Sequence, residues 1–273
     1  VRAVFDVLKP ALRTLVEQAP DDGDPPFAAA PYPRAPQEAL SREIAHAFGF
    51  DDAVFRLDPT VHPFCLSVGI DDIRLTTRYA EDDLYGTSLF STMHEVGHGL
   101  YEQQIGPSLH RTTLDCGVSY GVHESQSRLW ENQVGRSRAF WSHWLPRAQT
   151  ALPSLAGLDL DAFLHSVNVV RPTLIRVEAD EATYALHVIL RFELEVALLE
   201  GTLAVADIPA AWNDGMRDLL GVTVPDDAHG CLQDIHWAHG ERGYFPTYAI
   251  GNVMSGQLGD ALPERVAHPV VPR

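Results

Sequence analysis

The sequence predicts a mainly α-helical protein with a small β-sheet. In most of the long segments, including residues 1–19, 89–101 and 172–200, apolar residues recur at three- and four-residue spacing, as on one face of an α-helix. Residues 62–79 instead show a β-branched, alternating pattern, which is enough for one or two short strands. With 273 residues, 45% of them hydrophobic, the chain can form one large domain or two small ones.

The N-terminal part is expected to form two helices joined by a loop. An apolar stripe runs through residues 1–19, and a shorter one predicts a helix near residues 37–48. Between them, residues 20–37 are rich in proline and acidic side chains, which is typical of a loop.

The predicted strand region carries an unusual polar face. Asp72, Arg74 and Thr76 alternate along the chain, so their side chains share one side of a strand. This face fits a solvated edge of the sheet as well as it fits a functional surface.

Residues 92–101 contain the pattern H-E-x-x-H, formed by His94, Glu95 and His98. On a helix the two histidines lie about one turn apart, so both imidazoles can hold one metal ion. Glu95 lies beside the first histidine, where its carboxylate can accept a proton from a water molecule that the metal activates. The motif alone is only a hypothesis, and a third ligand is needed to support it.

Glu124 is the candidate for that third ligand. It follows His98 at a helix-turn-helix distance, in a long helix expected to begin at Tyr120 and to stop at Pro146. Two histidines and one glutamate leave a fourth position open, which is typical of catalytic rather than structural zinc. Spacing alone leaves Glu102 and Glu131 as alternatives, and a solvated helix carboxylate is the simplest explanation of Glu124.

Residues 172–200 show the most regular helical pattern, which Gly201 ends. Polar side chains form a stripe along it at steps of three and four residues, namely Arg176, Asp180, Tyr184, His187 and Arg191. The stripe fits either the wall of a polar cleft or a salt-bridged exposed face.

The C-terminal part is expected to contain one helix and a loop. The helix lies in residues 203–222, and the sequence Gly-Tyr-Phe-Pro-Thr-Tyr at residues 243–248 indicates the loop. Tyr244 or Tyr248 could donate a hydrogen bond to an oxyanion, although aromatic side chains in loops commonly serve as packing anchors. From residue 255 the tail loses its periodicity.

Composition narrows the class of protein. The net charge of −17 argues against nucleic acid as a partner. The three cysteines, Cys65, Cys116 and Cys231, are widely spaced and fit reduced thiols in the cytoplasm. No stretch approaches the length of apolar sequence that spans a membrane, so no membrane association is expected.

Six ordered motifs resemble those of the thermostable carboxypeptidase (carboxypeptidase Taq) family of zinc metallocarboxypeptidases. Together with Gly251-Asn252 they extend from about residue 60 to residue 252, and such an ordered set is far more specific than the zinc motif alone. The motifs are His62-Pro63-Phe64, Asp72-x-Arg74-x-Thr76, His94-Glu95-x-x-His98, His123-Glu124-Ser125-Gln126, Ile175-Arg176-x-x-Ala179-Asp180 and Gly243-Tyr244-Phe245-Pro246-Thr247-Tyr248.

The resemblance implies a metal site made by His94, His98 and Glu124, with Glu95 as the general base. It implies zinc, with cobalt as the alternative metal, and removal of single residues from peptide C-termini with broad specificity. The implied fold is a helical, zincin-like catalytic domain over residues 1–273, with a small sheet beside a groove, in a homodimer. Because typical members are longer, we expect the family's N-terminal helices and C-terminal segment to be absent.

An arginine fork suits recognition of a peptide's terminal carboxylate, and Arg176 and then Arg74 are the candidates for it. Asp180 is expected to orient Arg176 or to support a ligand histidine. Tyr248 and His236 are candidates for oxyanion stabilisation, and Tyr244 and His62 for the peptide site. The competing hypotheses are a zinc endopeptidase or dipeptidase, and an inactive metal-binding fragment.

Overall fold

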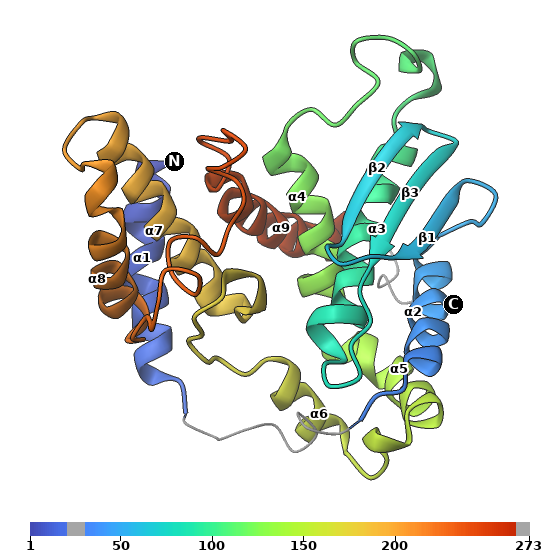
Figure 1. Ribbon diagram of the computed structural model, residues 1–273. Coiled ribbons are helices and arrows are strands. Elements are labelled where there is room, and N and C mark those ends of the chain that lie inside the picture. Colours follow the sequence, from blue (N-terminus) through green and yellow to red (C-terminus); the bar gives the residue numbers. More distant parts are fainter. Residues whose placement is uncertain (21–30, 266–273) are drawn as a thin grey trace. The chain divides into compact units, whose positions relative to one another are not determined.

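The chain divides into two units, each assembled from distant parts of the sequence (Figure 1). The computed structural model describes residues 1–20 and 31–265. Residues 31–167 and 251–265 form the sheet unit, and residues 1–20 and 168–250 form the helical unit. The boundary near the C-terminus falls within helix α9 (Pro246–Arg265). That the two units act as one catalytic domain stays a prediction.

The sheet unit combines a three-stranded sheet with most of the helices. Its strand order is β1-β3-β2, with β3 parallel to β1 and antiparallel to β2. The described elements are α2 (Arg34–Phe48), β1 (Phe55–Pro59), β2 (Phe64–Gly69), β3 (Asp72–Thr77), a π-helical segment (Tyr85–Leu89), α3 (Phe90–Gln103), α4 (Tyr120–Arg128), a second π-helical segment (Leu129–Val134), α5 (Arg138–Ala151) and α6 (Leu160–Val167), with short 3₁₀ turns at Pro107–Leu109 and Pro153–Leu155.

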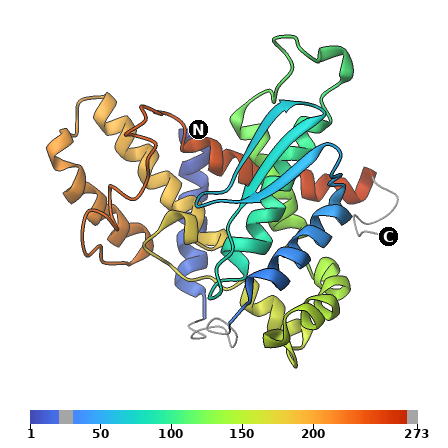
Figure 2. The same cartoon turned by 45° about the vertical axis from the view of Figure 1, so that its right-hand side comes forward.

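One face of the sheet packs on helix α3, as Figures 1 and 2 show. Ile73 and Leu75 of β3 are fully buried on that face. Gly99 of α3 makes the close contact possible, because a Cβ there would lie 2.8 Å from the ring of Phe55. Asp72, Arg74 and Thr76 lie on the opposite, more exposed face, so their polar character belongs to the outer side of the central strand.

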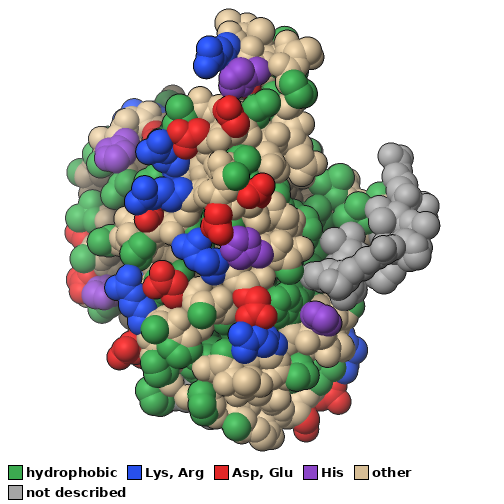
Figure 3. All heavy atoms as spheres, turned by 90° about the vertical axis from the view of Figure 1, so that its right-hand side faces the viewer, with side chains coloured by type: hydrophobic (Ala, Val, Ile, Leu, Met, Phe, Trp, Pro, Cys, Tyr) green, Lys and Arg blue, Asp and Glu red, His purple; other side chains and the backbone are tan. Residues whose placement is uncertain are grey.

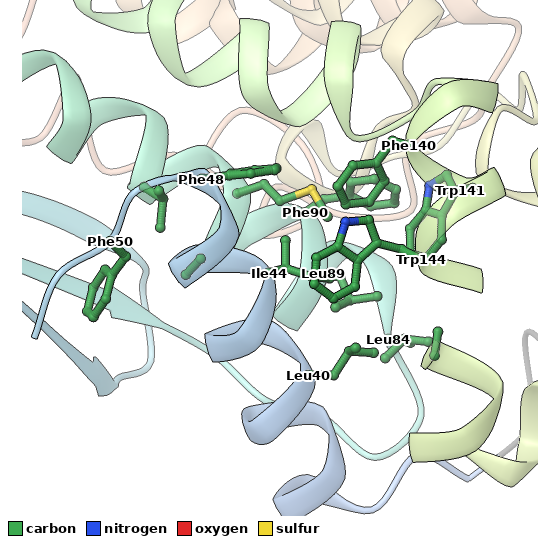
Figure 4. Close-up of a cluster of buried hydrophobic side chains, with 14 of the residues drawn as sticks. Leu40, Ile44, Phe48, Phe50, Leu84, Leu89, Phe90, Phe140, Trp141 and Trp144 are labelled. Atoms are coloured by element: carbon green, nitrogen blue, oxygen red, sulfur yellow. The ribbon is translucent and has the colours of Figure 1, made fainter. Parts of the chain in front are cut away.

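Helices α2, α3 and α5 share a hydrophobic core, drawn in Figure 4. Aromatic rings dominate it, and Phe48 of α2 packs on Phe140 of α5 with 5.8 Å between the ring centroids. The labelled members are Leu40, Ile44, Phe48, Phe50, Leu84, Leu89, Phe90, Phe140, Trp141 and Trp144.

Two predictions for the sheet unit need correction, and one strand was not predicted. The helix expected near residues 37–48 begins at Arg34, and strand β1 was missed because its five residues mix charge with only two buried positions. The long helix expected from Tyr120 to Pro146 is instead interrupted by the π-helical segment, and α5 continues through Pro146 to Ala151. Buried side chains on both sides of Pro146 hold α5 in place despite the missing N–H. Of the loop predicted for residues 20–37, residues 21–30 lie outside the described residues.

The helical unit packs α1 (Arg2–Gln18), α7 (Glu181–Leu199) and α8 (Ile208–Leu220) around buried Leu186, Ile189 and Trp212. It also contains 3₁₀ turns at Arg176–Glu178 and Val205–Asp207. The helix predicted for residues 172–200 begins only at Glu181. Asp180 ends the irregular segment before it, because its carboxylate accepts hydrogen bonds from the backbone N–H groups of Ala182 and Thr183, both at 2.9 Å.

Helix α9 corrects two predictions about the C-terminal part. It begins at Pro246, where the fixed φ of proline suits a first helical turn, so the predicted loop of residues 243–248 ends at Phe245. The tail is helical as far as Arg265, and residues 266–273 lie outside the described residues.

Charges of both signs are mixed on the face drawn in Figure 3. Exposed ion pairs in the described residues include Arg42–Asp52 at 3.2 Å and Arg147–Glu43 at 2.7 Å. None of the described helices is both long enough and apolar enough to cross a membrane.

The contact between α3 and α4 depends on Gly97, and we predict that Gly97→Ala destabilises the protein. A Cβ at residue 97 would lie 2.6 Å from the Cα of Ser127 and 2.8 Å from the backbone oxygen of Gln126. Backbone cannot move aside as a side chain can, so we expect a loss of about 2 kcal/mol in the free energy of unfolding, measured by urea denaturation.

Gly256→Ala in α9 is the matched control, because nothing lies within 4 Å of a Cβ placed there. It should leave stability unchanged or raise it by up to about 1 kcal/mol through helix propensity. Equal stabilisation by both substitutions would contradict the proposed close contact at Gly97.

Candidate metal centre

Three side chains from two neighbouring helices converge on one point in the sheet unit. His94 and His98 come from α3 and Glu124 from α4, and their donor atoms lie within 4.8 Å of one another. The two Nε2 atoms are 3.1 Å apart, and Glu124 Oε2 lies 3.8 Å from that of His94 and 3.5 Å from that of His98. A triangle with these sides has its centre about 2.0 Å from each atom, which matches the Zn–N and Zn–O distances of about 2.0–2.2 Å.

Two glycines allow the backbone to bring Glu124 to the histidines. Gly97, between the two histidines, lets α4 approach α3. On the other side, a Cβ on Gly251 would lie 2.6 Å from the Cγ of Glu124, so α9 closes on the side chain of this glutamate. Glu124 is therefore held between two helices and is only 5% exposed.

His94 is supported by a carboxylate on the side away from the site. Its Nδ1 lies 2.7 Å from Glu131 Oε2, which also accepts a hydrogen bond from Arg128 at 3.0 Å. Arg128 Nε donates to Glu124 Oε1 at 2.8 Å. One arginine therefore fixes both the candidate ligand Glu124 and the carboxylate behind His94.

His98 is supported by a second imidazole. The Nδ1 atoms of His98 and His123 are 2.6 Å apart, and His123 Nε2 lies 2.7 Å from Glu102 Oε1. Glu102 and Glu131, the two alternatives to Glu124 as third ligand, thus each belong to the support of one histidine. The structure brings Glu124, rather than either of them, to the shared point.

The carboxylate of Glu95 lies in the same electrostatic environment, and one of its oxygens has no hydrogen-bond partner in the described residues. The residue is 6% exposed, and the oxygen without a partner is Oε2. Burial raises its pKa to about 7 against the opposing effect of His94, and the negative charges of Glu124 and Glu131 act in the same direction as burial. A group with such a pKa can accept and release a proton near neutral pH.

The candidate ligands and the carboxylates around them contain more hydrogen-bond acceptors than donors, and a bound cation would balance this excess. Burial lowers the pKa of His98 to about 4, so its imidazole is neutral at pH 7. Burial also acts to lower the pKa of His94, but Glu124 and Glu131 outweigh it and raise that pKa above its ordinary value. A proton on His94 Nε2 can then be donated to His98 Nε2. A bound cation would take the place between these two nitrogens that such a proton fills.

In the helical unit, Arg176 is buried in an ion network with Asp234 and Arg191. Its Nε and Nη2 donate to Asp234 Oδ1 at 3.1 and 2.7 Å, and its Nη1 donates to the hydroxyl of Tyr184 at 2.9 Å. Arg191 Nε donates to the other oxygen of Asp234 at 2.6 Å. Burial works against the charge of Arg176, yet Tyr184 and Asp234 raise its pKa above the ordinary value.

The aromatic candidates lie around that network. The Tyr248 hydroxyl is 3.0 Å from His236 Nε2, and the Tyr244 and Tyr248 rings are in edge contact at 5.3 Å. Arg176 lies 4.9 Å from the centroid of the Tyr248 ring, a distance at which cation–π attraction operates. Asp234, and not Asp180, is the carboxylate that orients Arg176, since the oxygens of Asp180 cap α7.

The remaining candidates lie in the sheet unit. Arg74 is exposed and is paired with Asp72 through two hydrogen bonds of 2.9 Å. His62 is also exposed, and its Nδ1 lies 2.7 Å from the backbone oxygen of Pro63.

Sequence reasoning missed the roles of Arg128, His123 and Asp234. Arg128 follows Glu124 by four residues and precedes Glu131 by three, spacings that place all three on one helical face, so this signal was available. Asp234 lies in a loop far along the chain from Arg176 and Arg191, and no local pattern predicts that contact.

Comparison with known proteins identifies the family. The model of the Carboxypeptidase Taq (M32) metallopeptidase family matches residues 1–270. The chain belongs to this family. It is 46% identical to thermostable carboxypeptidase 1 of Thermus thermophilus over 93% of this chain and 50% of that protein. Carboxypeptidase 1 of Bacillus subtilis is 43% identical over 93% of this chain and 52% of its own length.

A solved structure of an M32 carboxypeptidase, that of Deinococcus radiodurans, has the same fold. It superimposes with a TM-score of 0.92 at 43% identity, covering 97% of this chain and 54% of that one. The mainly helical fold with a small sheet is thereby confirmed. The chain spans about half the length of the carboxypeptidases it matches. Membership of a metallopeptidase family implies a divalent metal ion. The described group of His94, His98 and Glu124 is suited to hold one.

Because Glu95 is buried, we predict that its ionisation lowers the stability of the folded, metal-free protein in a pH-dependent way. Burial raises its pKa from 4.5 to about 7, so the folded, metal-free protein binds this proton more tightly than the unfolded chain does. The resulting stabilisation is complete below pH 4.5 and is lost as the pH rises through 7.

We therefore expect metal-free Glu95→Gln to be more stable than the unsubstituted protein by about 3 kcal/mol at pH 8, with this advantage absent at pH 4.5. Urea denaturation with a chelator present measures both values. Glu43→Gln, at an exposed position, should show no comparable change with pH. A pH-independent advantage of Glu95→Gln would refute the assigned cause.

Proposed function

We propose that this chain carries the catalytic centre of a zinc metallocarboxypeptidase that releases single residues from peptide C-termini with broad specificity. The observation that carries the proposal is the convergence of His94, His98 and Glu124 together with the buried carboxylate of Glu95, whose Oε2 has no hydrogen-bond partner in the described residues. The names of the relatives as carboxypeptidases support the reaction class.

Zinc is the metal that this donor set favours, with cobalt as the alternative. Two imidazole nitrogens and one carboxylate oxygen form the protein part of a catalytic zinc site that keeps a position open. When bound, such a metal polarises the scissile carbonyl and lowers the pKa of the attacking water.

Glu95 is the group that moves the proton. Its Oε2 takes a proton from the attacking water and later delivers it to the nitrogen of the departing amino acid. Burial suits the carboxylate to both steps, because it strengthens the affinity of Glu95 for a proton.

Recognition of the free C-terminus falls to an arginine, with Arg176 the first candidate and Arg74 the second. Asp234 supports this role by fixing two guanidinium nitrogens of Arg176, which pre-orients the remaining donors. For stabilisation of the oxyanion we propose the Tyr248 hydroxyl, oriented by His236. Tyr244, His62 and Asp180 are kept as candidates for the peptide site.

Assembly and location complete the proposal. We infer a homodimer and a cytoplasmic location, the latter supported by three cysteines that are all free. Sedimentation of the purified chain tests the first, and fractionation of the source cells tests the second.

A mass-spectrometric time course tests the reaction. The zinc-loaded chain is mixed with a peptide that has a free C-terminus and, separately, with its C-terminal amide, and Glu95→Gln is run in parallel. We expect a ladder of single C-terminal losses only from the free peptide and only with the unsubstituted protein. Internal cuts in both peptides would indicate an endopeptidase, and bound zinc without cleavage would indicate an inactive metal-binding chain.

Arg176→Lys tests recognition of the terminal carboxylate. Lysine keeps the positive charge beside Asp234 but lacks the fork, so one charge-assisted hydrogen bond of about 1.5–3 kcal/mol is lost. We expect KM for the free peptide to rise about 10-fold or more, with zinc content unchanged. An unchanged KM would transfer the role to Arg74, for which the same measurement is made on Arg74→Lys.

A further inference from the structure

The two histidines of the metal centre are supported in different ways. The Nδ1 of His94 contacts the Glu131 carboxylate directly, whereas the Nδ1 of His98 contacts the Nδ1 of His123 at 2.6 Å. A nitrogen–nitrogen hydrogen bond needs one donor and one acceptor, so only one of these two atoms carries a hydrogen. Which one carries it decides whether His98 can bind a metal through Nε2.

Glu102 determines the direction of this hydrogen bond. Its Oε1, 2.7 Å from His123 Nε2, is an acceptor, so His123 Nε2 carries the hydrogen and donates it. With its hydrogen on Nε2, the His123 imidazole has its lone pair at Nδ1, which accepts the hydrogen of His98 Nδ1. The lone pair of His98 is thereby left on Nε2, the atom that lies 3.5 Å from Glu124 Oε2.

The surroundings fix the position of His123 as well as its hydrogen. Glu102 is 7% exposed, and its Oε1 also accepts a hydrogen bond from the backbone N–H of Gly117 at 3.2 Å. A Cβ on Gly117 would lie 2.7 Å from the Cδ2 of His123. Tyr101 packs edge-on against the same imidazole with 5.2 Å between the ring centroids. The ring is therefore confined between a helix and a loop.

We propose that His123 and Glu102 are positioning residues that hold His98 in its metal-binding tautomer and orientation. The inference rests on the metal centre of the proposed function but assigns two residues outside the ligand set. Partners of this kind behind a ligand histidine raise metal affinity about 10–100-fold. The expected effect is therefore on the dissociation constant of the metal, which is measured without any peptide substrate.

Glu102→Gln is the first test. The glutamine amide can donate to His123 Nε2, so the hydrogen bonds from residue 102 through His123 to His98 can run in the reverse direction. The preference for the metal-binding tautomer of His98 is then lost. Competition with a chelating dye gives the dissociation constants for zinc and for cobalt. We expect both to rise about 10–100-fold, while Glu43→Gln, a matched change in an exposed ion pair, leaves them unchanged.

His123→Ala with added imidazole separates the hydrogen bond from mere packing. His123 and Glu102 line a cavity of about 220 Å³ beside strand β2, through which a small molecule can reach the vacated position. We expect metal affinity to fall and to be partly restored by imidazole, in the variant but not in the unsubstituted protein. The visible spectrum of bound cobalt should change in the variant and return toward the original with imidazole.

The outcomes distinguish this inference from the proposed function. Dissociation constants unchanged in Glu102→Gln, or a cobalt spectrum unchanged in His123→Ala, would overturn the positioning role even if the protein cleaves peptides. A large loss of affinity with imidazole rescue would support the role even if the chain shows no peptidase activity. Circular dichroism identifies any variant that fails to fold, and the other variant then decides.

Discussion

The close approach of α3 and α4 at Gly97 is the constraint on which the metal centre depends. The two histidines are on one helix, and their i,i+4 spacing already brings their Nε2 atoms together. The third donor is on another helix, and it reaches them only because no side chain separates Gly97 from the backbone of Gln126 and Ser127. The same contact brings Glu131 and His123 within reach of the Nδ1 atoms of the two histidines.

That contact places several ionisable groups where water cannot separate them. Glu124, Glu131 and Glu95 are all largely buried, and Arg128 is the cation that joins the first two of them. Burial of unpaired charge is costly, and this cost is visible in the opposite pKa shifts of the carboxylates. The pKa of Glu131 falls to about 2 because Arg128 and His94 outweigh its burial, whereas that of Glu95 rises because burial outweighs the opposing effect of His94. The cluster is thus most stable with an additional positive charge.

The sequence was sufficient for those features that arise from local periodicity. The helices at residues 1–19 and 89–101 follow from their apolar stripes, and the strands β2 and β3 lie in the region where alternation predicted them. Predictions failed where a single residue outweighs a pattern. The apolar spacing of residues 172–200 is helical throughout, yet Asp180 starts a new helix because its carboxylate satisfies two backbone donors.

The choice among Glu102, Glu124 and Glu131 shows the limit of spacing as evidence. The spacing of all three from the two histidines is compatible with the role of third metal ligand, and the ordered motifs favoured Glu124. The structure shows why the other two were competitive, since both approach the site to within 2.7 Å of an imidazole nitrogen. Their distance along the chain could not reveal that one lies behind His94 and the other behind His123, because this depends on the packing angle between α3 and α4.

The unequal support of the two histidines has a physical consequence for the centre. A carboxylate behind His94 adds negative charge close to the site, whereas behind His98 the imidazole ring of His123 lies between the ligand histidine and Glu102. A second carboxylate directly behind His98 would add its negative charge to those of Glu124, Glu131 and Glu95. The interposed His123 sets the hydrogen-bond direction of His98 while keeping the charge of Glu102 one ring farther away. The single side chain of His123 therefore controls the tautomer of His98 without placing another carboxylate in contact with it.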